Sequence, residues 1–301
     1  MSKNVPPGFE LLGAVPEVLG APSRFGPSKV LEALRACRTG EIISLNLELD
    51  DEHGAPFGRS PLRRSMRLHN QLRPFGEGRY MVVNDDEVSF ALQGSSQWDA
   101  YGHFGVIDSE SDSIFFGGNL TDTFPAPSAG RIGIQALGPG IVTRGVLVDV
   151  VTEYGDGAPF LDGDCRIDTA MVERCLERQG VSVEPGDAVL VYTGMERRRA
   201  SMGGAWPPDS AGLTADTISL WERLDIQALV SDNLGIDVTP GDNALHASLL
   251  KGRGVPLGEL WALDHLAQRC RAESRWDFLL AAVPLNIFGA FGSPANAIAI
   301  W

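Results

Sequence analysis

Short apolar runs alternate with helical segments in the second half of the chain, and this order restricts the fold more than any other feature. The apolar runs cover residues 144–151, 188–193 and 226–230. They are rich in valine, leucine and isoleucine and have the length of buried strands. The segments 168–179 and 214–224 have helical spacing and begin with a capping residue. Strands that alternate with helices are typical of an α/β protein with parallel strands.

The remaining segments add further elements to this plan. We expect helices over 27–37, 243–251 and 257–270, and strands over 41–49, 279–285 and 297–301. Residues 79–93 should form a hairpin that turns at 84–86, an Asn-Asp-Asp sequence suited to turns. The predicted class is therefore α/β, with a mixed sheet and packed helices.

Length and composition predict one domain. The 301 residues are 44% hydrophobic, enough for a large core, and no linker rich in proline, glycine or serine divides them. We therefore expect a single domain over 1–301. Residues 1–40 are interpreted as an N-terminal extension and residues near 50–77 as a loop insertion.

The charge and the cysteine usage of the chain argue against several classes of protein. A net charge of −14 argues against nucleic acid as a partner. Scattered cysteines without a Cys-x-x-Cys pair indicate a reducing compartment, and no run of ~18 apolar residues suggests a membrane span. A cytoplasmic protein is expected. The insertion carries five arginines that either form a local anion site or, more simply, lie on a solvated loop: Arg59, Arg63, Arg64, Arg67 and Arg73.

One segment concentrates polar side chains at alternate positions. Gln93, Gln97, Asp99 and His103 all have odd numbers, and residues of one parity share a face on an extended strand. A straight strand at ~3.3 Å per residue would spread them over roughly 30 Å, too far for one small site. Glycine and serine between them allow the chain to bend. A polar face that bends back on itself predicts a ligand site.

The same segment resembles the motif His-x-Gly-Thr-His-x-Asp-x-Pro-x-His of the cyclase family of metal-dependent hydrolases, which includes kynurenine formamidase and isatin hydrolase. The two histidine ligands of the motif fall on Gln93 and Gln97, and the aspartate ligand on Asp99. The proline falls on Tyr101 and the last histidine on His103. The chain is thus similar to a Gln-Trp-Asp variant of the family. The resemblance extends from about residue 40 to the C-terminus and includes residues 147–150, 184–194, 232–233, 254–259 and 292–300.

The resemblance implies a swivelling β/β/α fold and a site that joins distant parts of the chain. In two-metal members a late histidine and glutamate complete the site, and His246 and Glu259 match them. The implied cofactor is a divalent metal, manganese or zinc, held by Asp99, His246 and Glu259. Without the resemblance, a structural histidine, a first-turn glutamate and an Asp99–His103 hydrogen bond would be the simpler interpretations.

The two glutamines leave two possibilities for where the metal binds and for what the glutamines themselves contact. A carboxamide oxygen is a weak neutral ligand that suits Mn²⁺ better than Zn²⁺. Either the metal occupies a site made of Asp99, His246 and Glu259, which we favour, or Gln93 and Gln97 bind substrate instead. In the first case the glutamines support the ligands or contact substrate. Three aromatic residues either pack in the core or line a pocket for a flat ring: Trp98, Tyr101 and Phe104.

The resulting functional hypothesis is a metal-dependent hydrolase that uses metal-activated water. Its substrate would be an amide, cyclic amide or lactone of a small aromatic or cyclic metabolite, with carbon–nitrogen bonds other than peptide bonds as the main target. His103 is the candidate general base, because imidazole titrates near neutral pH. The alternative is a metal-free family member that binds a small metabolite without hydrolysis. Members of the family commonly form dimers, so a homodimer or a larger homo-oligomer is expected.

Overall fold

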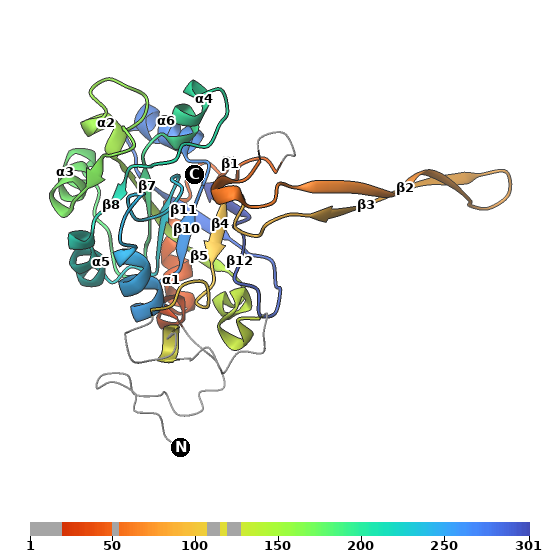
Figure 1. Ribbon diagram of the computed structural model, residues 1–301, viewed down its shortest axis with the longest axis horizontal. Coiled ribbons are helices and arrows are strands. Elements are labelled where there is room, and N and C mark those ends of the chain that lie inside the picture. Colours follow the sequence, from red (N-terminus) through yellow and green to blue (C-terminus); the bar gives the residue numbers. More distant parts are fainter. Residues whose placement is uncertain (1–19, 50–53, 107–114, 119–127) are drawn as a thin grey trace, which may run out of the picture.

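A nine-stranded mixed sheet runs through the centre of the molecule (Figure 1). This computed structural model describes residues 20–49, 54–106, 115–118 and 128–301. The order across the sheet is β1-β13-β11-β5-β7-β9-β10-β4-β12. Its strands are β1 (Ile42–Ser44), β4 (Gln97–Asp99), β5 (Ile141–Asp149), β7 (Ala188–Tyr192), β9 (Ala228–Ser231), β10 (Leu257–Glu259), β11 (Asp277–Ala282), β12 (Gly292–Pro294) and β13 (Ala297–Ile300).

The middle of the sheet is parallel and its two sides are antiparallel. Strands β5, β7, β9 and β10 pair in parallel, in that order. Every residue of β7 and β9 is buried, as the continuous apolar runs predicted. The outer strands join by antiparallel pairing, β11, β13 and β1 on one side and β4 and β12 on the other. The predicted α/β class with a mixed sheet is confirmed.

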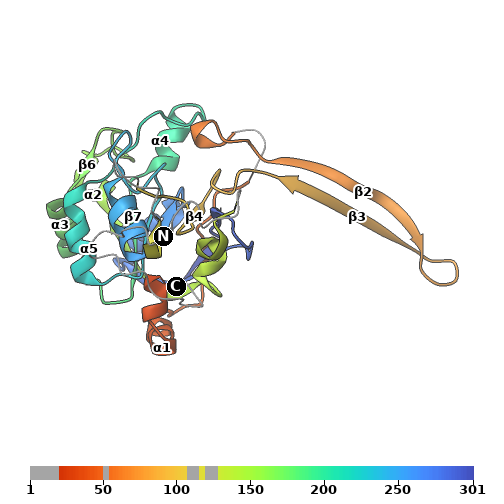
Figure 2. The ribbon, with the colours of Figure 1, turned by 60° about the horizontal axis from the view of Figure 1, so that its bottom comes forward.

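Helices cover this sheet. The α-helices are α1 (Pro27–Ala33), α2 (Val150–Tyr154), α3 (Thr169–Gln179), α4 (Met195–Ser201), α5 (Ile218–Leu224) and α6 (Asp264–Glu273). Shorter 3-10 turns are η1 (Ala21–Arg24), η2 (Leu34–Ala36), η3 (Pro56–Gly58), η4 (Phe116–Gly118), η6 (Gly130–Ile132), η7 (Ile134–Leu137) and η8 (Ala215–Thr217), and η9 (His246–Lys251) is a π-helix. Helices α2, α3 and α5 gather on one side of the sheet (Figures 1 and 2).

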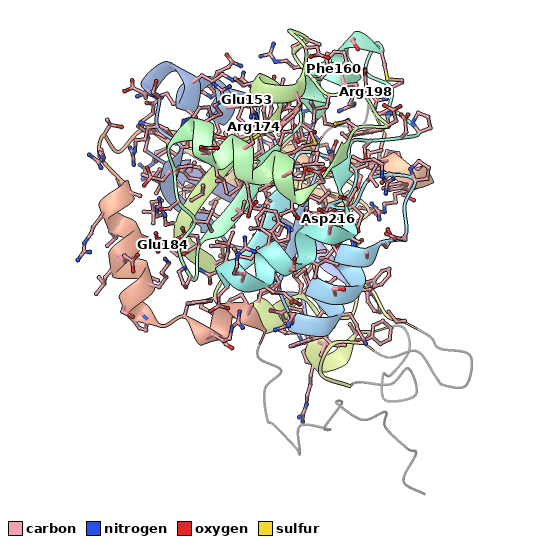
Figure 3. All side chains as sticks on the ribbon, turned by 90° about the vertical axis from the view of Figure 1, so that its left-hand side faces the viewer. Glu153, Phe160, Arg174, Glu184, Arg198 and Asp216 are labelled. Atoms are coloured by element: carbon pink, nitrogen blue, oxygen red, sulfur yellow. The ribbon has the colours of Figure 1, made fainter. Side chains whose placement is uncertain are left out.

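The predicted helix over 168–179 has the ends that the sequence indicated. The Asp168 side chain accepts a hydrogen bond from the backbone N–H of Met171 at 2.9 Å, and Gly180 follows the helix in a left-handed conformation. On the outer surface of α3, Arg174 lies 4.0 Å from Glu153 of α2 (Figure 3). No helix of the described residues is long and apolar enough to cross a membrane.

A long hairpin, made of β2 (Arg63–Pro74) and β3 (Tyr80–Ser89), corrects two expectations. Residues 63–74 are a strand and not a loop, because they pair with β3 from Arg63 to Pro74, with irregularities between Met66 and Gln71. The turn lies at 75–79, where Gly76 and Gly78 adopt positive φ, and not at 84–86. The acidic residues of 84–86 fit in a strand because both faces of the hairpin are exposed to solvent.

The expected helix over 257–270 is also corrected. Residues 257–259 form β10, which pairs with both β9 and β4, and the helix α6 begins only at Asp264. Pairing on both edges within the sheet overrides the helical spacing of this segment. A further two-stranded sheet joins β6 (Arg166–Ile167) to β8 (Gly212–Leu213).

Candidate metal centre

Strand β4 presents Gln97 and Asp99 on one face, as their odd numbering predicted. Gln97 lies opposite Glu259 of β10, and Asp99 lies opposite Gly292 of β12. Residues directly opposite each other in an antiparallel pair project to the same face. The sheet therefore places a carboxamide and two carboxylates side by side.

The predicted bends lie on both sides of β4. Gln93 is in the turn before the strand, and its Nε2 lies 2.7 Å from where a side chain at Gly292 would begin. Because Gly292 is opposite Asp99, the Gln93 amide lies on the same face of the sheet as the Asp99 side chain. His103 is in the turn after the strand, and its Nε2 is 3.8 Å from Asp99 Oδ1. The glycine at 292 leaves the space that the Gln93 side chain occupies.

Asp99, His246 and Glu259 converge, as the family resemblance implied. His246 is the first residue of the π-helix η9, and its Nε2 lies 3.2 Å from Glu259 Oε1 and 3.5 Å from Asp99 Oδ2. One potential ligand atom from each of the three residues lies within 4.8 Å of the other two. All three are buried. Side chains up to 160 positions apart in the sequence thus surround one point.

The orientation of His246 depends on Asp237, which the sequence analysis missed. Asp237 Oδ2 lies 2.6 Å from His246 Nδ1, while its Oδ1 accepts the backbone N–H of Leu245 at 2.8 Å. This contact leaves Nε2 to face Asp99 and Glu259. A carboxylate on the far nitrogen of a metal-binding histidine is a common way to fix the ring and its tautomer. No spacing in the sequence links Asp237 to His246, since it lies in an irregular loop.

Glu259 is held in a similar manner. Gln97 Nε2 donates to Glu259 Oε2 at 2.7 Å, and the backbone N–H of Ile236 donates to Oε1 at 3.2 Å. Gln97 therefore positions a candidate ligand, in a place where the family motif has a ligand of its own.

Several buried oxygen atoms of this cluster have no hydrogen-bond partner. Both carboxylate oxygens of Asp99 are unpartnered although the residue is 0% exposed, and so is Oε1 of Gln97. A buried carboxylate that accepts no hydrogen bond is costly unless positive charge compensates for it, and here only the imidazoles of His246 and His103 lie near, at 3.5 and 3.8 Å, among the described residues. The two carboxylates of Asp99 and Glu259 and the imidazole nitrogen of His246 form a donor set that suits a divalent cation.

The neighbouring charges shift the pKa values of Asp99 and His246 in opposite directions. Burial would raise the pKa of Asp99, but His103, His246 and Arg59 outweigh it and hold the pKa below the ordinary value. Burial would lower the pKa of His246, but the neighbouring carboxylates of Asp237, Asp99 and Glu259 raise it well above the ordinary value. Asp99 is consequently ionised at neutral pH, which a metal ligand requires.

The aromatic residues of the motif occupy different environments. Phe104 is partly buried, with its ring centroid 5.4 Å from that of His246, so it borders the cluster. Trp98 points to the opposite face of β4 and packs in the core, edge-on to Trp261 at 5.0 Å. Tyr101 is fully buried, with its ring 4.8 Å from Phe116. Phe104 is the best placed of these aromatic residues for contact with a substrate.

Among the described arginines of the insertion, Arg59 lies near enough to Asp99 for its charge to lower the pKa of that carboxylate. It precedes the hairpin and donates to the backbone carbonyl of Gln93 at 2.6 Å. Arg64 and Arg67 instead lie 3.6 Å from Asp86 and Glu87 on the hairpin. The possible anion site of five arginines is therefore not assembled at one place.

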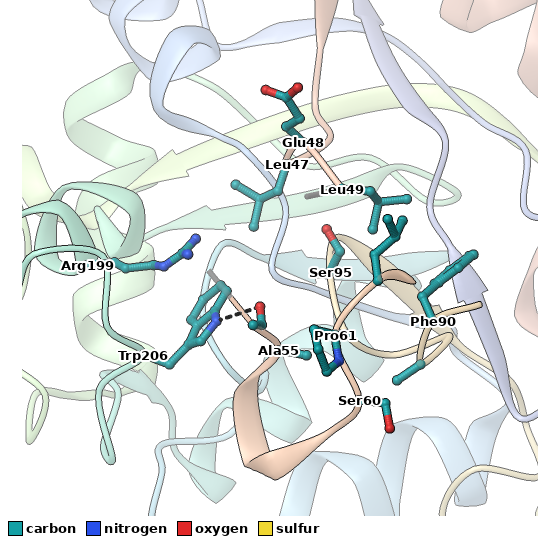
Figure 4. Close-up of a pocket in the computed structure, with 14 residues that line it drawn as sticks. Leu47, Glu48, Leu49, Ala55, Ser60, Pro61, Phe90, Ser95, Arg199 and Trp206 are labelled. Atoms are coloured by element: carbon teal, nitrogen blue, oxygen red, sulfur yellow. Dashed lines mark hydrogen bonds between the residues drawn. The ribbon is translucent and has the colours of Figure 1, made fainter. Parts of the chain in front are cut away.

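Two cavities lie away from the cluster. The first, about 30 Å³, lies where the hairpin leaves the body, beside Trp206, whose Nε1 donates to the carbonyl of Gly54 (Figure 4). It has room for only a few water molecules. The second, about 960 Å³, is bordered by Tyr101, Gln227 and Phe288 among others, and none of its lining residues belongs to the metal cluster.

The geometry can be compared with that of known proteins. A crystal structure described as a novel cyclase has 29% sequence identity, covers 94% of this chain and 95% of its own, and superposes with a TM-score of 0.82. Isatin hydrolase A from Labrenzia aggregata, bound to benzyl benzoate, has 20% identity, covers 90% and 97%, and gives a TM-score of 0.59. A protein from Bacillus stearothermophilus described as a "predicted metal-dependent hydrolase" has 15% identity, covers 86% and 97%, and gives 0.54.

Sequence comparison points to the same group. No curated protein matches the chain significantly. The family profile described as "Putative cyclase" matches residues 43–238, about two thirds of the chain. This region contains β4 with Gln97 and Asp99, and the fold agrees with that of the novel cyclase over almost the whole length. The chain belongs to the cyclase family.

Proposed function

We propose that this protein is a metal-dependent hydrolase that opens an amide, a cyclic amide or a lactone of a small aromatic or cyclic metabolite. The observation that carries the proposal is the buried Asp99 carboxylate, unpartnered at both oxygens and facing His246 and Glu259. The isatin hydrolases among the structural relatives, and the relative described as a "predicted metal-dependent hydrolase", support the reaction class. Carbon–nitrogen bonds other than peptide bonds are the main expected target.

Asp99, His246 and Glu259 are the residues that would hold the ion, Mn²⁺ in the first place and Zn²⁺ in the second. Asp99 offers both oxygens, His246 offers Nε2, and Glu259 offers Oε1, since its Oε2 accepts from Gln97. When bound, the ion supplies Lewis acidity toward a carbonyl group and toward water.

His103 is the proposed general base. Its side chain is 27% exposed, in contrast to the buried ligands, and its Nε2 lies near Asp99. It can therefore reach both the cluster and solvent, accept a proton from the attacking water and return it to the leaving nitrogen or oxygen. A ring of the substrate would contact Phe104, which lies beside His246.

The two glutamines have separate proposed roles. Gln97 keeps Glu259 in position through Nε2, and its unpartnered Oε1 can accept a hydrogen bond from a substrate N–H or act as a further weak ligand. Gln93 lies above Gly292, on the same face of the sheet as Asp99, and is placed to contact substrate.

The test is a substrate panel with protein that has been stripped by a chelator and reloaded with Mn²⁺ or Zn²⁺. The panel contains N-formyl aromatic amines, fused-ring cyclic amides and aromatic lactones. Ring opening or deformylation should occur only with the reloaded protein, and His103→Ala should lower kcat by roughly 10²–10⁴-fold while the ion stays bound. Turnover that persists in stripped protein would refute the metal-dependent reaction.

One observation favours the alternative, a metal-free protein that binds a metabolite. His246 lies within 3.5 Å of three carboxylates, so a protonated imidazole can offset part of their charge without an ion. In that case the stripped and reloaded proteins would bind a panel compound equally well, and no product would form with either.

A further inference from the structure

The cavity of about 960 Å³ has no part in the proposed reaction, and it is large enough to hold a ligand of its own. One wall is the segment from η1 to α1, including Phe25 and Val30, and another is the segment from η7 to β5, including Leu137 and Val142. In Figure 1, α1 and the yellow-green turns η6 and η7 lie at the same lower end of the molecule. Sites for small molecules have volumes of roughly 300–1,000 Å³.

The walls of this cavity are mainly apolar, and the cavity opens to solvent. Its lining includes Leu31 of α1 and Phe288, which are 65% and 71% exposed, beside the fully buried Tyr101. Water in an apolar cavity finds few hydrogen-bond partners, and an apolar group that displaces such water gains free energy. The cavity therefore favours a ligand with a large apolar part.

A single charged side chain, Arg131, is present among the described residues that line the cavity. Arg131 belongs to η6 and is exposed, and no hydrogen bond or ion pair joins it to another described residue. Its guanidinium group thus has all its donors available, in a planar arrangement that matches a carboxylate. On a chain with a net charge of −14, a cavity whose charge is positive favours an anion.

We propose that this cavity is a second ligand site, which binds an apolar carboxylate: a ring system or a chain that carries one carboxylate group. The apolar part lies between α1 and the segment after η7, and the carboxylate pairs with Arg131. None of the lining residues belongs to the cluster of Asp99, His246 and Glu259. Binding in the cavity therefore requires no metal ion.

Two matched fluorescent probes, pyrenebutyrate and pyrenebutanol, test the site. They share the same apolar ring and differ in the group that would face Arg131. Chelator-stripped protein should bind one pyrenebutyrate per chain with a Kd on the order of 10 µM, as expected for about 20 non-hydrogen atoms. Pyrenebutanol should bind roughly 3–10-fold more weakly, because it cannot form the ion pair.

The same titration distinguishes the cavity from the metal centre. Reloading with Mn²⁺ should change the Kd of pyrenebutyrate by less than about twofold, since the cavity and the cluster share no residue. Binding that appears only after reloading would place the carboxylate on the ion and overturn the proposal. An absence of saturable binding up to about 1 mM probe would overturn it as well.

Substitution of Arg131 tests the ion pair. Arg131→Gln should weaken the binding of pyrenebutyrate by roughly 3–10-fold and leave that of pyrenebutanol within about twofold, because only the first probe is charged. Arg166→Gln is the control, since Arg166 is an exposed arginine on β6 outside the cavity. Equal affinity of the native protein and Arg131→Gln for pyrenebutyrate would refute the role of Arg131.

A pair of exposed leucines tests whether the probes lie in the cavity. Leu31 and Leu34 are 65% and 49% exposed, and of the two only Leu31 lines the cavity. Leu31→Asp should weaken the binding of both probes by roughly tenfold, because it places a charge against the apolar part, while Leu34→Asp should stay within about twofold of the native protein. Equal effects of the two variants would show that the probes bind elsewhere on the surface, and would overturn the proposal.

Discussion

Two buried side chains, Asp237 and Gln97, determine how the candidate ligands are presented. Asp237 takes the Nδ1 side of His246, and Gln97 takes one oxygen of Glu259. The first contact leaves His246 Nε2 to face Asp99, and the second leaves Glu259 Oε1 to face His246 Nε2. The geometry of the cluster is therefore fixed by ordinary hydrogen bonds within the chain.

Replacement of Asp237 should weaken metal binding without loss of the fold. Asp237→Asn keeps an oxygen for the backbone N–H of Leu245 but removes the charge beside His246. We expect a decrease in Mn²⁺ affinity of roughly 10–100-fold, as for other residues that orient a ligand. Titration calorimetry measures it, with Asp242→Asn as the control, since Asp242 caps the same segment from an exposed position. Unchanged affinity would mean that Asp237 does not orient the ligand.

Restoring histidine at both glutamine positions tests what the glutamines do. The double variant Gln93→His/Gln97→His should bind Zn²⁺ more tightly, because imidazole is a better ligand for zinc than a carboxamide. It should also lose turnover, since Glu259 loses its donor at 2.7 Å. Zinc affinity and kcat, measured on the same preparation, report the two effects separately. If both stay as in the native protein, the glutamines lie outside the functional site.

Sequence reasoning reached part of this residue-scale picture. Alternation along 97–99 correctly put Gln97 and Asp99 on one face, and the same rule places Trp98 on the other, in the core. His246 and Glu259 could be paired with Asp99 only through the family resemblance. Asp237 could not be found, because its partner lies nine residues away through a loop without periodicity.

At the scale of elements, the first turn of α4 contains an acidic group in an unfavourable place. Burial, together with Asp264 and Asp232, raises the pKa of Glu196 to about 7. The folded protein thus binds a proton that the unfolded chain has released at the same pH. Stability from this group is complete below about pH 4.5 and is lost as pH rises through 7.

The variant Glu196→Gln should remove this loss of folding stability at high pH. Above pH 7 the variant should be more stable than the native protein by about 1–2 kcal/mol, after allowance for solvent screening, and below pH 4.5 the difference should vanish. Denaturant unfolding at a series of pH values measures this difference. Glu32→Gln, at a half-exposed site on α1, is the control and should show no such trend. A constant difference at all pH values would contradict the assignment.

Helices and strands could be predicted from the sequence where one face or the whole element is buried in the core. The parallel strands β7 and β9 follow from continuous apolar runs, and α3 follows from its cap and spacing. The expected hairpin over 79–93 was given the wrong turn, and its first strand was taken as a loop, because β2 and β3 have no buried face and no alternation of apolar and polar residues marks them. The strand β10 was assigned to a helix because three residues carry too little pattern to reveal pairing with distant strands.

At the scale of the whole molecule, the candidate metal centre lies where the sheet turns from parallel to antiparallel. Glu259 is at the end of β10, the last parallel strand, and Asp99 is at the end of the antiparallel β4. His246 reaches the same point from the π-helix η9. The fold thus brings three separate segments to one point of the sheet.

The most direct test of the account is metal binding by the native protein and by Asp99→Asn. Calorimetric titration of chelator-stripped protein should show one Mn²⁺ per chain, with Zn²⁺ competing for the same site. Asp99→Asn should weaken binding by at least ~100-fold with an unchanged circular dichroism spectrum, because a neutral carboxamide replaces the buried carboxylate. Asp156→Asn, at a positive-φ position that asparagine tolerates, should bind as the native protein does. Equal Mn²⁺ affinity in the native protein and Asp99→Asn, or no binding by the native protein, would contradict a metal centre at Asp99, His246 and Glu259.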